Sequence, residues 1–529
     1  MRAYVPLRLL LLSACAGAGS PAGPEGAPSA TPAFSVRLTV DTAAARQPIS
    51  PYVYGHNQAD WNRRHRGLRL GRLGGNRWTA YNWETNASNA GSDFRHQNDA
   101  FLGGGDVAGE AVRPHVAAGR AAGAAMVVTV PMAGYVSADK RGDGDVSATP
   151  GHLETRFHES LPQKPGALRY PPDTGDRVVY QDEFVAWVEA TFPRGGGPPI
   201  FYSLDNEPDL WASTHARIRP TGPVTYAEVV ERTTDWAQAV KWTAPDALVF
   251  GPVNYGWQGF VRLQNAPDAR GRDFLDVYLA EMAAAGRRFG RPLVDVLDVH
   301  WYPEARGGGV RVTEASGADA VAAARVQAPR SLWDPSYVEA SWIAQDAGVG
   351  AIRLLPRLRE KVAARAPGTR LAMTEYNYGG GDHISGGIAQ ADVLGIFGRE
   401  GVFAAAFWSL AESERFADAG FAAYCDFDGA GGRFGDTSVA AQTSDLPNVT
   451  VYASVTADDR VVVVAINKSP GAAAADLTVA HPADLRAQAY ALTSASPAMV
   501  RAADPARTGR NQFRLTLAGS SVTTIALTR

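Results

Sequence analysis

The segment Phe201–Trp211, FYSLDNEPDLW, joins a short apolar run to a turn that carries Asp205, Glu207 and Asp209. Continuous apolar runs, as opposed to alternating ones, are typical of strands in a parallel sheet that is covered on both faces. Polar residues that directly follow such a strand lie at its carboxyl end. The segment therefore predicts a buried parallel strand that delivers carboxylates to one edge of a sheet.

The same pattern of an apolar run, a polar and aromatic tip and a helical stretch recurs along the chain. Eight such runs lie at 52–57, 68–83, 124–132, 199–208, 247–256, 294–303, 370–379 and 404–410. Eight strands that alternate with helices predict an α/β fold of the (β/α)8 TIM-like barrel type, whose site residues lie at the carboxyl ends of the strands. An open doubly wound sheet is the alternative.

Several segments between these runs predict helices. The clearest is TYAEVVERTTDWAQAVKW at 225–242, where Thr225 and Glu228 form a capping box ahead of an apolar stripe. Further helices are expected at 181–192, 273–286, 355–366 and 387–400.

The last part of the chain has a different sequence pattern. From about residue 445, short alternating runs separated by turn residues predict a β-sandwich. FSVRLTVD at 34–41 has the same character, so we expect it to pair into this sandwich. The expected division is a leader and tether at 1–33, an N-terminal strand of the sandwich at 34–50, the barrel at 51–435 and the sandwich at 436–529.

The N-terminus is typical of a targeting segment. Arg2 and Arg8 precede an apolar run, and Leu12 to Cys15 resemble a bacterial lipobox, in which the cysteine receives lipid. An ordinary secretory signal is the alternative, and both predict export as a secreted or surface-anchored protein. Cys425 has no partner after processing and is expected to be a packed thiol.

Charge excludes some classes of partner. The 51 basic and 54 acidic residues are well mixed and give a net charge of -3, so nucleic acid is not expected as a partner. We expect an uncharged ligand and, by default, a monomer.

Two glutamates at strand tips carry the main chemical signal. Glu207 follows Asn206 at the end of the fourth run, and Glu375 lies in Thr374-Glu375-Tyr376-Asn377 at the end of the seventh. The ends of these strands face each other across the mouth of a barrel. Two carboxyl groups that flank one bond are the minimal equipment for glycoside hydrolysis, whereas a lone loop glutamate is more often a capping or ion-paired group.

Four motifs make the resemblance to a family specific: 74–93 (GGNRWTAYNWETNASNAGSD), 203–211 (SLDNEPDLW), 298–304 (DVHWYPE) and 373–380 (MTEYNYGG). With these motifs the chain resembles glycoside hydrolase family 44, which comprises bacterial retaining endoglucanases and xyloglucanases with a TIM-like barrel and a β-sandwich. The resemblance implies Glu207 as general acid/base and Glu375 as nucleophile. We expect the pKa of Glu207 to be raised, and Glu375 to be held ionised beside Tyr376 and near Arg77.

Other residues at the strand tips are candidates for substrate binding. Asn206 is placed to bond the sugar hydroxyl beside the anomeric carbon, and His300 and Tyr302 to contact the nucleophile or the sugar, although His300 could instead be satisfied within the upper layer of the barrel. Aromatic rings stack on the C–H faces of sugars. We expect about half of the strand-tip tryptophans to do so. The candidate aromatic residues are Trp78, Tyr81, Trp83, Trp301, Tyr376 and Trp408.

A metal site is a weaker prediction. Asp139, Asp143 and Asp145 lie at short spacing in one loop, as calcium ligands do, but the EF-hand spacing is absent. A structural calcium is therefore possible, and no cofactor is expected for the chemistry.

The combined expectation is an exported, retaining endo-β-1,4-glucanase that acts on a soluble glucan such as xyloglucan or carboxymethylcellulose. One alternative keeps the carboxylates and changes the substrate to xylan, mannan or an arabinofuranoside. A second alternative is a non-catalytic surface lipoprotein that binds glucan.

Overall fold

The structure is a computed structural model, and it describes residues 32–57, 59–61, 67–219 and 222–529. The predicted leader, with Cys15, lies outside the described residues. Pro32–Arg529 forms one compact unit that contains both the barrel and the sandwich.

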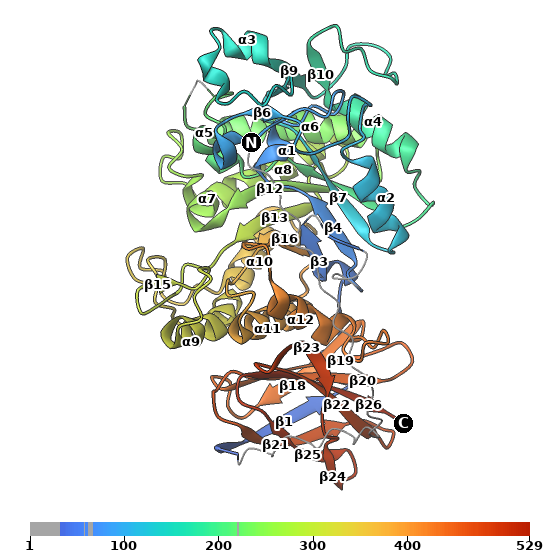
Figure 1. Cartoon of the computed structure of the whole chain (residues 1–529), viewed down its shortest axis with the longest axis vertical. Helices are drawn as coiled ribbons and strands as arrows, with labels where there is room; N and C mark the ends of the chain where they lie inside the picture. The colour runs from blue at the N-terminus through green and yellow to red at the C-terminus, as the bar shows by residue number, and fades with distance from the viewer. Residues whose placement is uncertain (1–31, 58, 62–66, 220–221) are drawn as a thin grey trace, which may run out of the picture. The chain divides into compact units, whose positions relative to one another are not determined.

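Eight parallel strands close into a barrel (Figure 1). Each pairs in parallel with its neighbours, and each lies within one of the eight apolar runs, which confirms the predicted barrel and excludes the open sheet. In order around the barrel they are β3 (Gly55–Asn57), β4 (Leu70–Leu73), β7 (Ala125–Val130), β11 (Ile200–Leu204), β12 (Val249–Tyr255), β13 (Val296–Trp301), β16 (Arg370–Tyr376) and β17 (Ala404–Phe407).

Helices surround the barrel strands. The capping side chain of Thr225 accepts a hydrogen bond from the backbone N–H of Glu228, which is one half of the predicted capping box. The carboxylate of Glu228, predicted to supply the other half, pairs with Arg219 and Arg232. The principal helices are α2 (Arg113–Ala121), α4 (Gln181–Thr191), α6 (Tyr226–Thr243), α7 (Gly256–Arg262), α8 (Phe274–Phe289), α9 (Asp319–Gln327), α10 (Leu354–Arg365), α11 (Ile384–Glu400) and α12 (Arg415–Cys425). Cys425 is buried and free at the end of α12, as expected for a packed thiol.

Short elements extend the connections around the barrel. They are β5 (Ser88–Asn89), β6 (Asn98–Asp99), β8 (Tyr135–Ser137), β9 (Phe157–Leu161), β10 (Val178–Tyr180), β14 (Arg306–Gly307), β15 (Val310–Arg311), α1 (Asn76–Thr79), α3 (His152–Arg156), α5 (Trp211–Thr214) and the 3-10 turns η1 (Pro51–Val53), η2 (Gly91–Phe94), η3 (Val146–Ala148), η4 (Pro208–Leu210) and η5 (Ala328–Leu332). Of these, η1 precedes β3, and the others follow the carboxyl end of a barrel strand.

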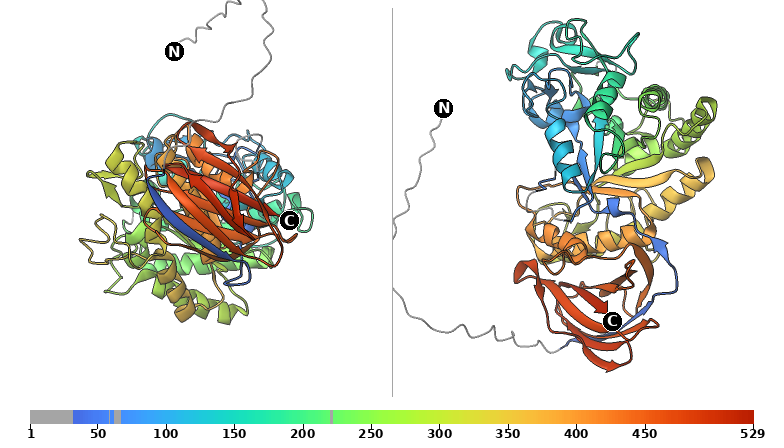
Figure 2. Two further views of the ribbon diagram at one scale, coloured as in Figure 1. Left: turned by 90° about the horizontal axis from the view of Figure 1, so that it is seen from below. Right: turned by 90° about the vertical axis from the view of Figure 1, so that its right-hand side faces the viewer.

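The remaining strands form the predicted sandwich. β1 pairs in parallel with β21 and antiparallel with β18, so the segment at 34–41 lies beside strands from the other end of the chain (Figure 2). The strands are β1 (Phe34–Asp41), β2 (Gln47–Pro48), β18 (Thr437–Thr443), β19 (Val449–Val455), β20 (Val461–Asn467), β21 (Ala473–Ala480), β22 (Arg486–Thr493), β23 (Ser496–Arg501), β24 (Ala506–Gly509), β25 (Gln512–Leu517) and β26 (Ser521–Thr528).

Strand β18 is shared between the two layers of the sandwich. Thr437, Ser438 and Val439 pair with β19, whereas the residues from Ala440 to Thr443 pair with β1. The sheet folds over at this strand, and side chains from both layers make one core that includes Leu38, Val463, Leu477 and Ile525.

Helix α11 joins the barrel to the sandwich through a buried carboxylate. Asp392 on α11 accepts hydrogen bonds from the hydroxyls of Thr450 at 2.8 Å and Tyr452 at 2.7 Å, and it lies 2.7 Å from the ammonium of Lys468. Both members of this ion pair are almost completely buried. Buried hydrogen bonds and an ion pair therefore hold α11 against the strands of the sandwich.

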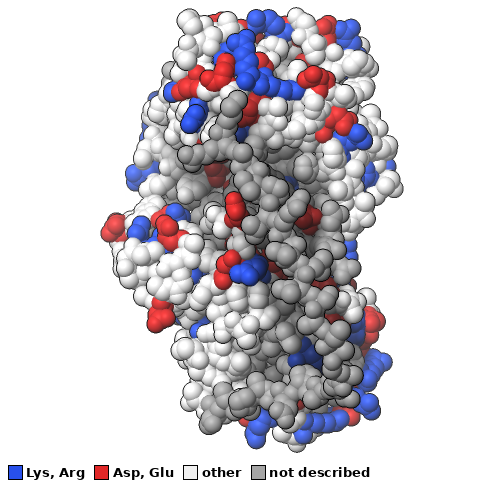
Figure 3. Space-filling model, viewed as in Figure 1, with Lys and Arg blue, Asp and Glu red and all other residues white. Residues whose placement is uncertain are grey.

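The surface agrees with the charge pattern of the sequence. On the face in Figure 3, described basic and acidic side chains are interspersed. Within the described part of the chain, no helix combines the length and the apolar character that crossing a membrane requires.

Candidate active site

The turn that follows β11 is strained and tightly held. Asp205 and Glu207 both adopt left-handed backbone conformations, with φ of 64° and 45°, which residues other than glycine seldom adopt. The buried carboxylate of Asp205 accepts hydrogen bonds from the backbone N–H groups of Met132, Ala133 and Asn206. The turn thus aims the side chains of Asn206 and Glu207 in a fixed direction, as strained segments at functional sites often do.

Glu207 and Glu375 converge on His300. Nδ1 of His300 lies 2.8 Å from Oε1 of Glu207 and 3.5 Å from Oε2 of Glu375. One ligand atom from each of the three residues lies within 4.8 Å of the others, and all three residues are buried. The two carboxyls therefore face one small volume at the mouth of the barrel.

Arg72 is the cation beside Glu375. Its Nη1 donates to Oε1 of Glu375 at 2.7 Å and to Oδ1 of Asn57 at 3.1 Å, while Nη2 donates to Oδ1 of Asn206 at 2.9 Å. The expectation that Arg77 fills this place is wrong. Arg77 pairs with Asp99 at 2.6 Å, because it lies beyond the tip of β4 whereas Arg72 lies within the strand and points into the barrel.

Tyr302 and Asn206 complete the ring around the pair. The hydroxyl of Tyr302 donates to Oε2 of Glu375 at 2.9 Å. Oδ1 of Asn206 also accepts from the backbone N–H of Gly75 at 3.2 Å. These bonds fix the Asn206 amide so that Nδ2 is its donor end, and the nearest acceptor, Oδ1 of Asn76, lies at 3.4 Å.

The surroundings raise the pKa of both carboxyls, but that of Glu207 more strongly. Burial raises the pKa of Glu207 well above its ordinary value, and the charge of Glu375 raises it further. Burial also raises the pKa of Glu375, but Arg72 and Tyr302 oppose that rise. The arrangement favours a protonated Glu207 beside an ionised Glu375, since titratable groups in such pairs separate into acid and base roles.

Strand alternation turns two of the predicted aromatic residues away from the inner face of the barrel. Trp301 lies between the inward residues His300 and Tyr302, so it points outward and stacks on Phe260. Tyr376 follows Glu375 and likewise points outward, where its hydroxyl accepts from Gln390 on α11. Both side chains are buried in the layer between strands and helices rather than in the mouth.

Three further aromatic candidates also belong to the core. Trp78 packs edge-on against Tyr81 with ring centres 4.9 Å apart, and Trp83 stacks on Phe184 at 5.7 Å. Trp78, Tyr81 and Trp83 are at most 2% exposed. The expectation that they contact substrate is wrong, because the loop after β4 folds back and packs these rings against one another and against Phe184 on α4.

Trp408, a predicted substrate-binding residue, lines a cavity next to the carboxyl pair. The cavity has a volume of about 490 Å³ and adjoins the site through Gly75, which bonds Asn206. Its other lining residues are Gly74, Asn76, Arg77, Asp93, Phe94, Asp99, Phe101 and Leu102. Phe94 and Phe101 are 48% and 72% exposed, so they offer aromatic surface that the sequence pattern did not reveal.

A second, smaller cavity of about 140 Å³ lies at the tips of β12 and β13, across the barrel from the tips of β4 and β17 where Trp408 lies. Tyr302, which bonds Glu375, lines it together with Tyr255, Trp257, Trp301 and Trp342. The candidate Trp301 therefore borders this cavity, although its side chain is almost completely buried. Aromatic cavities thus flank the two glutamates on both sides, an arrangement that suits a ligand longer than one sugar ring.

The aspartates in the predicted calcium loop are engaged by arginines. Arg156 pairs with Asp139 at 2.6 Å and with Asp143 at 2.7 Å, and Arg217 pairs with Asp145 at 2.7 Å. Among the described residues, the group of acidic and histidine side chains that converges closely enough to hold a metal is Glu207, His300 and Glu375. The predicted loop site is therefore not formed.

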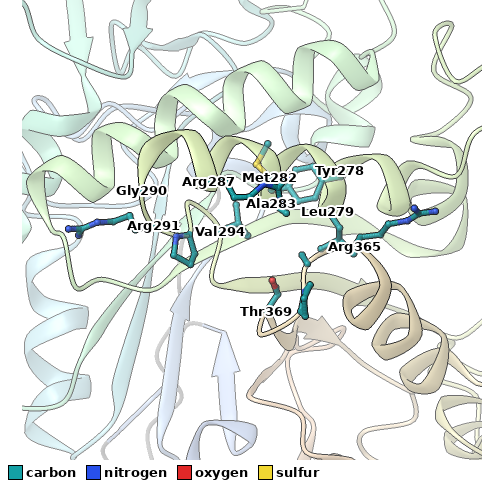
Figure 4. A pocket seen from close by; sticks show the side chains of 14 residues that line it. Tyr278, Leu279, Met282, Ala283, Arg287, Gly290, Arg291, Val294, Arg365 and Thr369 are labelled. Atoms are coloured by element: carbon teal, nitrogen blue, oxygen red, sulfur yellow. The ribbon is translucent and has the colours of Figure 1, made fainter.

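An apolar cavity of about 460 Å³ lies elsewhere, between α8 and the end of α10 (Figure 4). Val294 and Thr369 in its lining precede β13 and β16, which places it at the opposite ends of the strands from the glutamates. Arg291 and Arg365 point away from it in opposite directions (Figure 4). It contains no carboxylate and is separate from the site.

The sequence model of glycoside hydrolase family 44 matches residues 87–305 of this chain, a range that includes Glu207 and His300. A xyloglucanase of that family from Paenibacillus polymyxa superposes with a TM-score of 0.89 at 40% identity, over 94% of this chain and 100% of the other. The chain belongs to glycoside hydrolase family 44.

Other relatives agree with this assignment. The family 44 endoglucanase Cel44A from Clostridium thermocellum has a TM-score of 0.88 at 39% identity, over 94% of this chain and 100% of the other. Endoglucanase A of Paenibacillus lautus is 42% identical over 81% of this chain, and beta-mannanase/endoglucanase A of Caldicellulosiruptor saccharolyticus is 42% identical over 80%. The family 44 chain spans 62% and 33% of the lengths of these two proteins, respectively.

Proposed function

We propose that this family 44 chain is a retaining endo-β-1,4-glucanase, with Glu207 as general acid/base and Glu375 as nucleophile. Glu375 attacks the anomeric carbon while Glu207 protonates the leaving oxygen. Glu207 then takes a proton from the water that releases the sugar and restores Glu375. The double displacement requires these two carboxyls and water, and no cofactor.

The approach of the two carboxyls carries this proposal. Retaining glycosidases hold them about 5 to 5.5 Å apart, whereas inverting enzymes leave roughly 6.5 to 9.5 Å for a water molecule. In this chain, one oxygen of Glu207 and one of Glu375 lie within 4.8 Å of each other. Arg72 and Tyr302 on Glu375 support its role as the ionised nucleophile.

We propose a soluble β-1,4-glucan such as xyloglucan or carboxymethylcellulose as the substrate. Cavities lined by Trp408 on one side and Trp257 on the other support binding along a chain, with cleavage inside it. The relatives' names support the same class: one is a xyloglucanase and one is an endoglucanase. The name of the Caldicellulosiruptor protein includes a mannanase, so mannan is a second candidate.

The decisive experiment measures hydrolysis of xyloglucan, carboxymethylcellulose and mannan by the full chain and by Glu207→Gln and Glu375→Gln. We expect the parent to cleave a glucan and both variants to lose nearly all activity while they remain folded by circular dichroism. Proton NMR of the first product should show the β-anomer. An α-anomer would overturn retention, and glucan binding without cleavage by the parent would favour a binding protein.

We also propose that the chain is exported, with lipid attached at Cys15. The basic residues, apolar run and small residues at 1–15 support this. Fractionation of bacterial cells that express the full chain or Cys15→Ala tests it. Membrane association that the substitution abolishes is expected; equal distribution of both would leave an ordinary secretory signal.

A further inference from the structure

A buried chain of polar groups runs from Glu207 to Asp298, away from the mouth of the barrel. Nδ1 of His300 lies 2.8 Å from Oε1 of Glu207, and Nε2 of His300 lies 3.4 Å from Oγ1 of Thr374. The hydroxyl of Thr374 donates to Oδ2 of Asp298 at 2.7 Å. Asp298, His300 and Thr374 are fully buried.

A bulge between β13 and β16 creates this contact. Val299 pairs with Met373, but the next pair is His300 with Glu375, so Thr374 is an additional residue on β16. Bulges re-aim side chains and are frequent next to active sites. The backbone N–H of Thr374 donates to Oδ1 of Asp298 at 3.1 Å, and its carbonyl accepts from Asn57, which fixes the bulge on both sides.

The direction of the hydrogen bonds determines the tautomer of His300. The single hydroxyl proton of Thr374 is given to Asp298, so Oγ1 is left as the acceptor for Nε2–H of His300. Burial and Arg72 lower the pKa of His300 well below its ordinary value, so the ring is neutral. Nδ1 then carries no proton and can only accept a hydrogen bond from Glu207. A protonated Glu207 can donate that bond, whereas an ionised Glu207 cannot.

We propose that Asp298 and Thr374 are positioning residues that fix the tautomer of His300 and thereby hold Glu207 in its acid form. Each hydrogen bond of this chain then has one donor and one acceptor. Glu207 donates to Nδ1 of His300, Nε2–H of His300 donates to Oγ1 of Thr374, and the Thr374 hydroxyl donates to Asp298. If each of the three protons moves one step toward Asp298, Glu207 becomes ionised and Asp298 becomes protonated. The charge is then exchanged between the two carboxyls without any external donor.

This proposal rests on the proposed role of Glu207. Other charged and titratable groups face the relay: Arg72 and Glu375 act on both His300 and Asp298, Tyr302 bonds Glu375, and Asp298 raises the pKa of Tyr278 on α8. Burial raises the pKa of Asp298 to about 6, so it is ionised at neutral pH and able to accept from Thr374.

The test is the pH dependence of kcat/KM on a soluble glucan, whose basic limb reports the acid in the free enzyme. Without the Thr374 hydroxyl, His300 is free to place its proton on Nδ1 and donate to an ionised Glu207. Thr374→Val should therefore move the basic limb to lower pH by about 0.5 to 1 unit, as expected for one hydrogen bond. Thr374→Ser should restore it.

The matched control is Thr129→Val. Like Thr374, Thr129 is a buried threonine on a barrel strand. Its hydroxyl donates to the backbone carbonyl of Leu73 and is not part of the chain to His300. The basic limb of kcat/KM for Thr129→Val should lie at the same pH as that of the parent. Asp298→Asn alone should shift the basic limb of kcat/KM. Added to Thr374→Val it should cause little further shift, since both substitutions break the same chain of hydrogen bonds.

A second readout is independent of activity. In protein labelled with ¹⁵N-histidine, the His300 resonances, identified by their loss in His300→Asn, should show Nε2–H in the parent and Nδ1–H in Thr374→Val. An unchanged tautomer and an unchanged basic limb in an active Thr374→Val would overturn the relay. Failure of the proposed function is distinct, because it would appear as an inactive parent or an active Glu207→Gln.

Discussion

Nη1 of Arg72 lies 2.7 Å from Oε1 of Glu375, and neither side chain is more than 6% exposed. The same guanidinium reaches Asn206 with its other terminal nitrogen. A planar fork of this kind holds two acceptors in a fixed relation, which the point charge of a lysine does not. One residue on β4 therefore sets the position of the proposed nucleophile and of the amide that precedes the proposed acid.

Loss of Arg72 should weaken the proposed nucleophile. Arg72 lowers the pKa of Glu375 by its charge and its hydrogen bond. In Arg72→Met that pKa rises, so the fraction of ionised Glu375 falls at a given pH and the acidic limb of kcat/KM moves to higher pH. One charged hydrogen bond contributes about 1.5 to 3 kcal/mol, or roughly 10- to 150-fold in rate.

The matched control for this prediction is Arg69→Met. Arg69 directly precedes β4 and bonds the carbonyl of Gly123, at the far end of the strand from the mouth. Its pH profile should match that of the parent. An unchanged acidic limb in a folded Arg72→Met would contradict the role given to Arg72.

Azide should distinguish the two glutamates. Removal of the acid by Glu207→Ala leaves a slow release of the sugar from Glu375, and azide should restore the rate on an aryl glycoside and give a β-glycosyl azide. In Glu375→Ala azide can attack directly and should give the α-product. General acid/base catalysis contributes about 10²- to 10⁴-fold, which sets the loss expected for Glu207→Ala on polysaccharide. NMR of the azide products decides between the assignments.

Trp408 should contribute to binding more than to chemistry. It lines the cavity beside Gly75, so Trp408→Ala should raise KM for a long glucan by about tenfold if the ring contributes about 1.4 kcal/mol. Phe101→Ala, further out in the same cavity, should raise KM for the polymer and leave short oligosaccharides unaffected. Trp242 is exposed and lies outside both flanking cavities, so Trp242→Ala is the control.

The Asp392–Lys468 pair should be a large contributor to stability when one partner is removed. Breaking a buried ion pair leaves an uncompensated charge and costs about 3 to 5 kcal/mol. Asp392→Ala should therefore lower the midpoint of thermal unfolding strongly, and the double variant Asp392→Leu/Lys468→Met should recover much of the loss. Calorimetry measures both, and equal midpoints for parent and Asp392→Ala would contradict the prediction.

Chelation should leave hydrolysis unchanged, because the proposed chemistry depends on two carboxyls and water. The test is the rate on soluble glucan before and after dialysis against EDTA. A loss that calcium restores would instead reveal a structural ion, which remains a prediction for this chain.

The barrel was predictable because most of its strands lie in apolar runs that end in polar or aromatic residues, and this pattern can be read without knowledge of contacts. The glutamates were predictable for the same reason, since each lies at such a tip. The aromatic residues were harder. Whether Trp301 or Tyr302 faces the mouth depends on strand register, and a shift of one residue exchanges the inner and outer faces.

Arg72 was missed although its sequence carried a signal. It is a charged residue inside the apolar strand β4, and it is fully buried. A charge in such a place needs a partner of opposite sign, so the arginine within the strand was a better candidate than Arg77 beyond it. Thr374 could not be recognised, because its contact depends on a bulge that only the paired strands reveal.

The pairing of β1 has a consequence for biosynthesis. Arg37 bonds Ser444 across a separation of 407 residues, and β1 is enclosed by strands from the last part of the chain. At about 5 to 20 residues per second, a ribosome needs roughly 20 to 80 s to supply those partners. Throughout that interval the nascent chain exposes a strand with both edges open, and an open edge is a template for aggregation. We therefore expect that shielding this segment during expression raises the yield of folded protein.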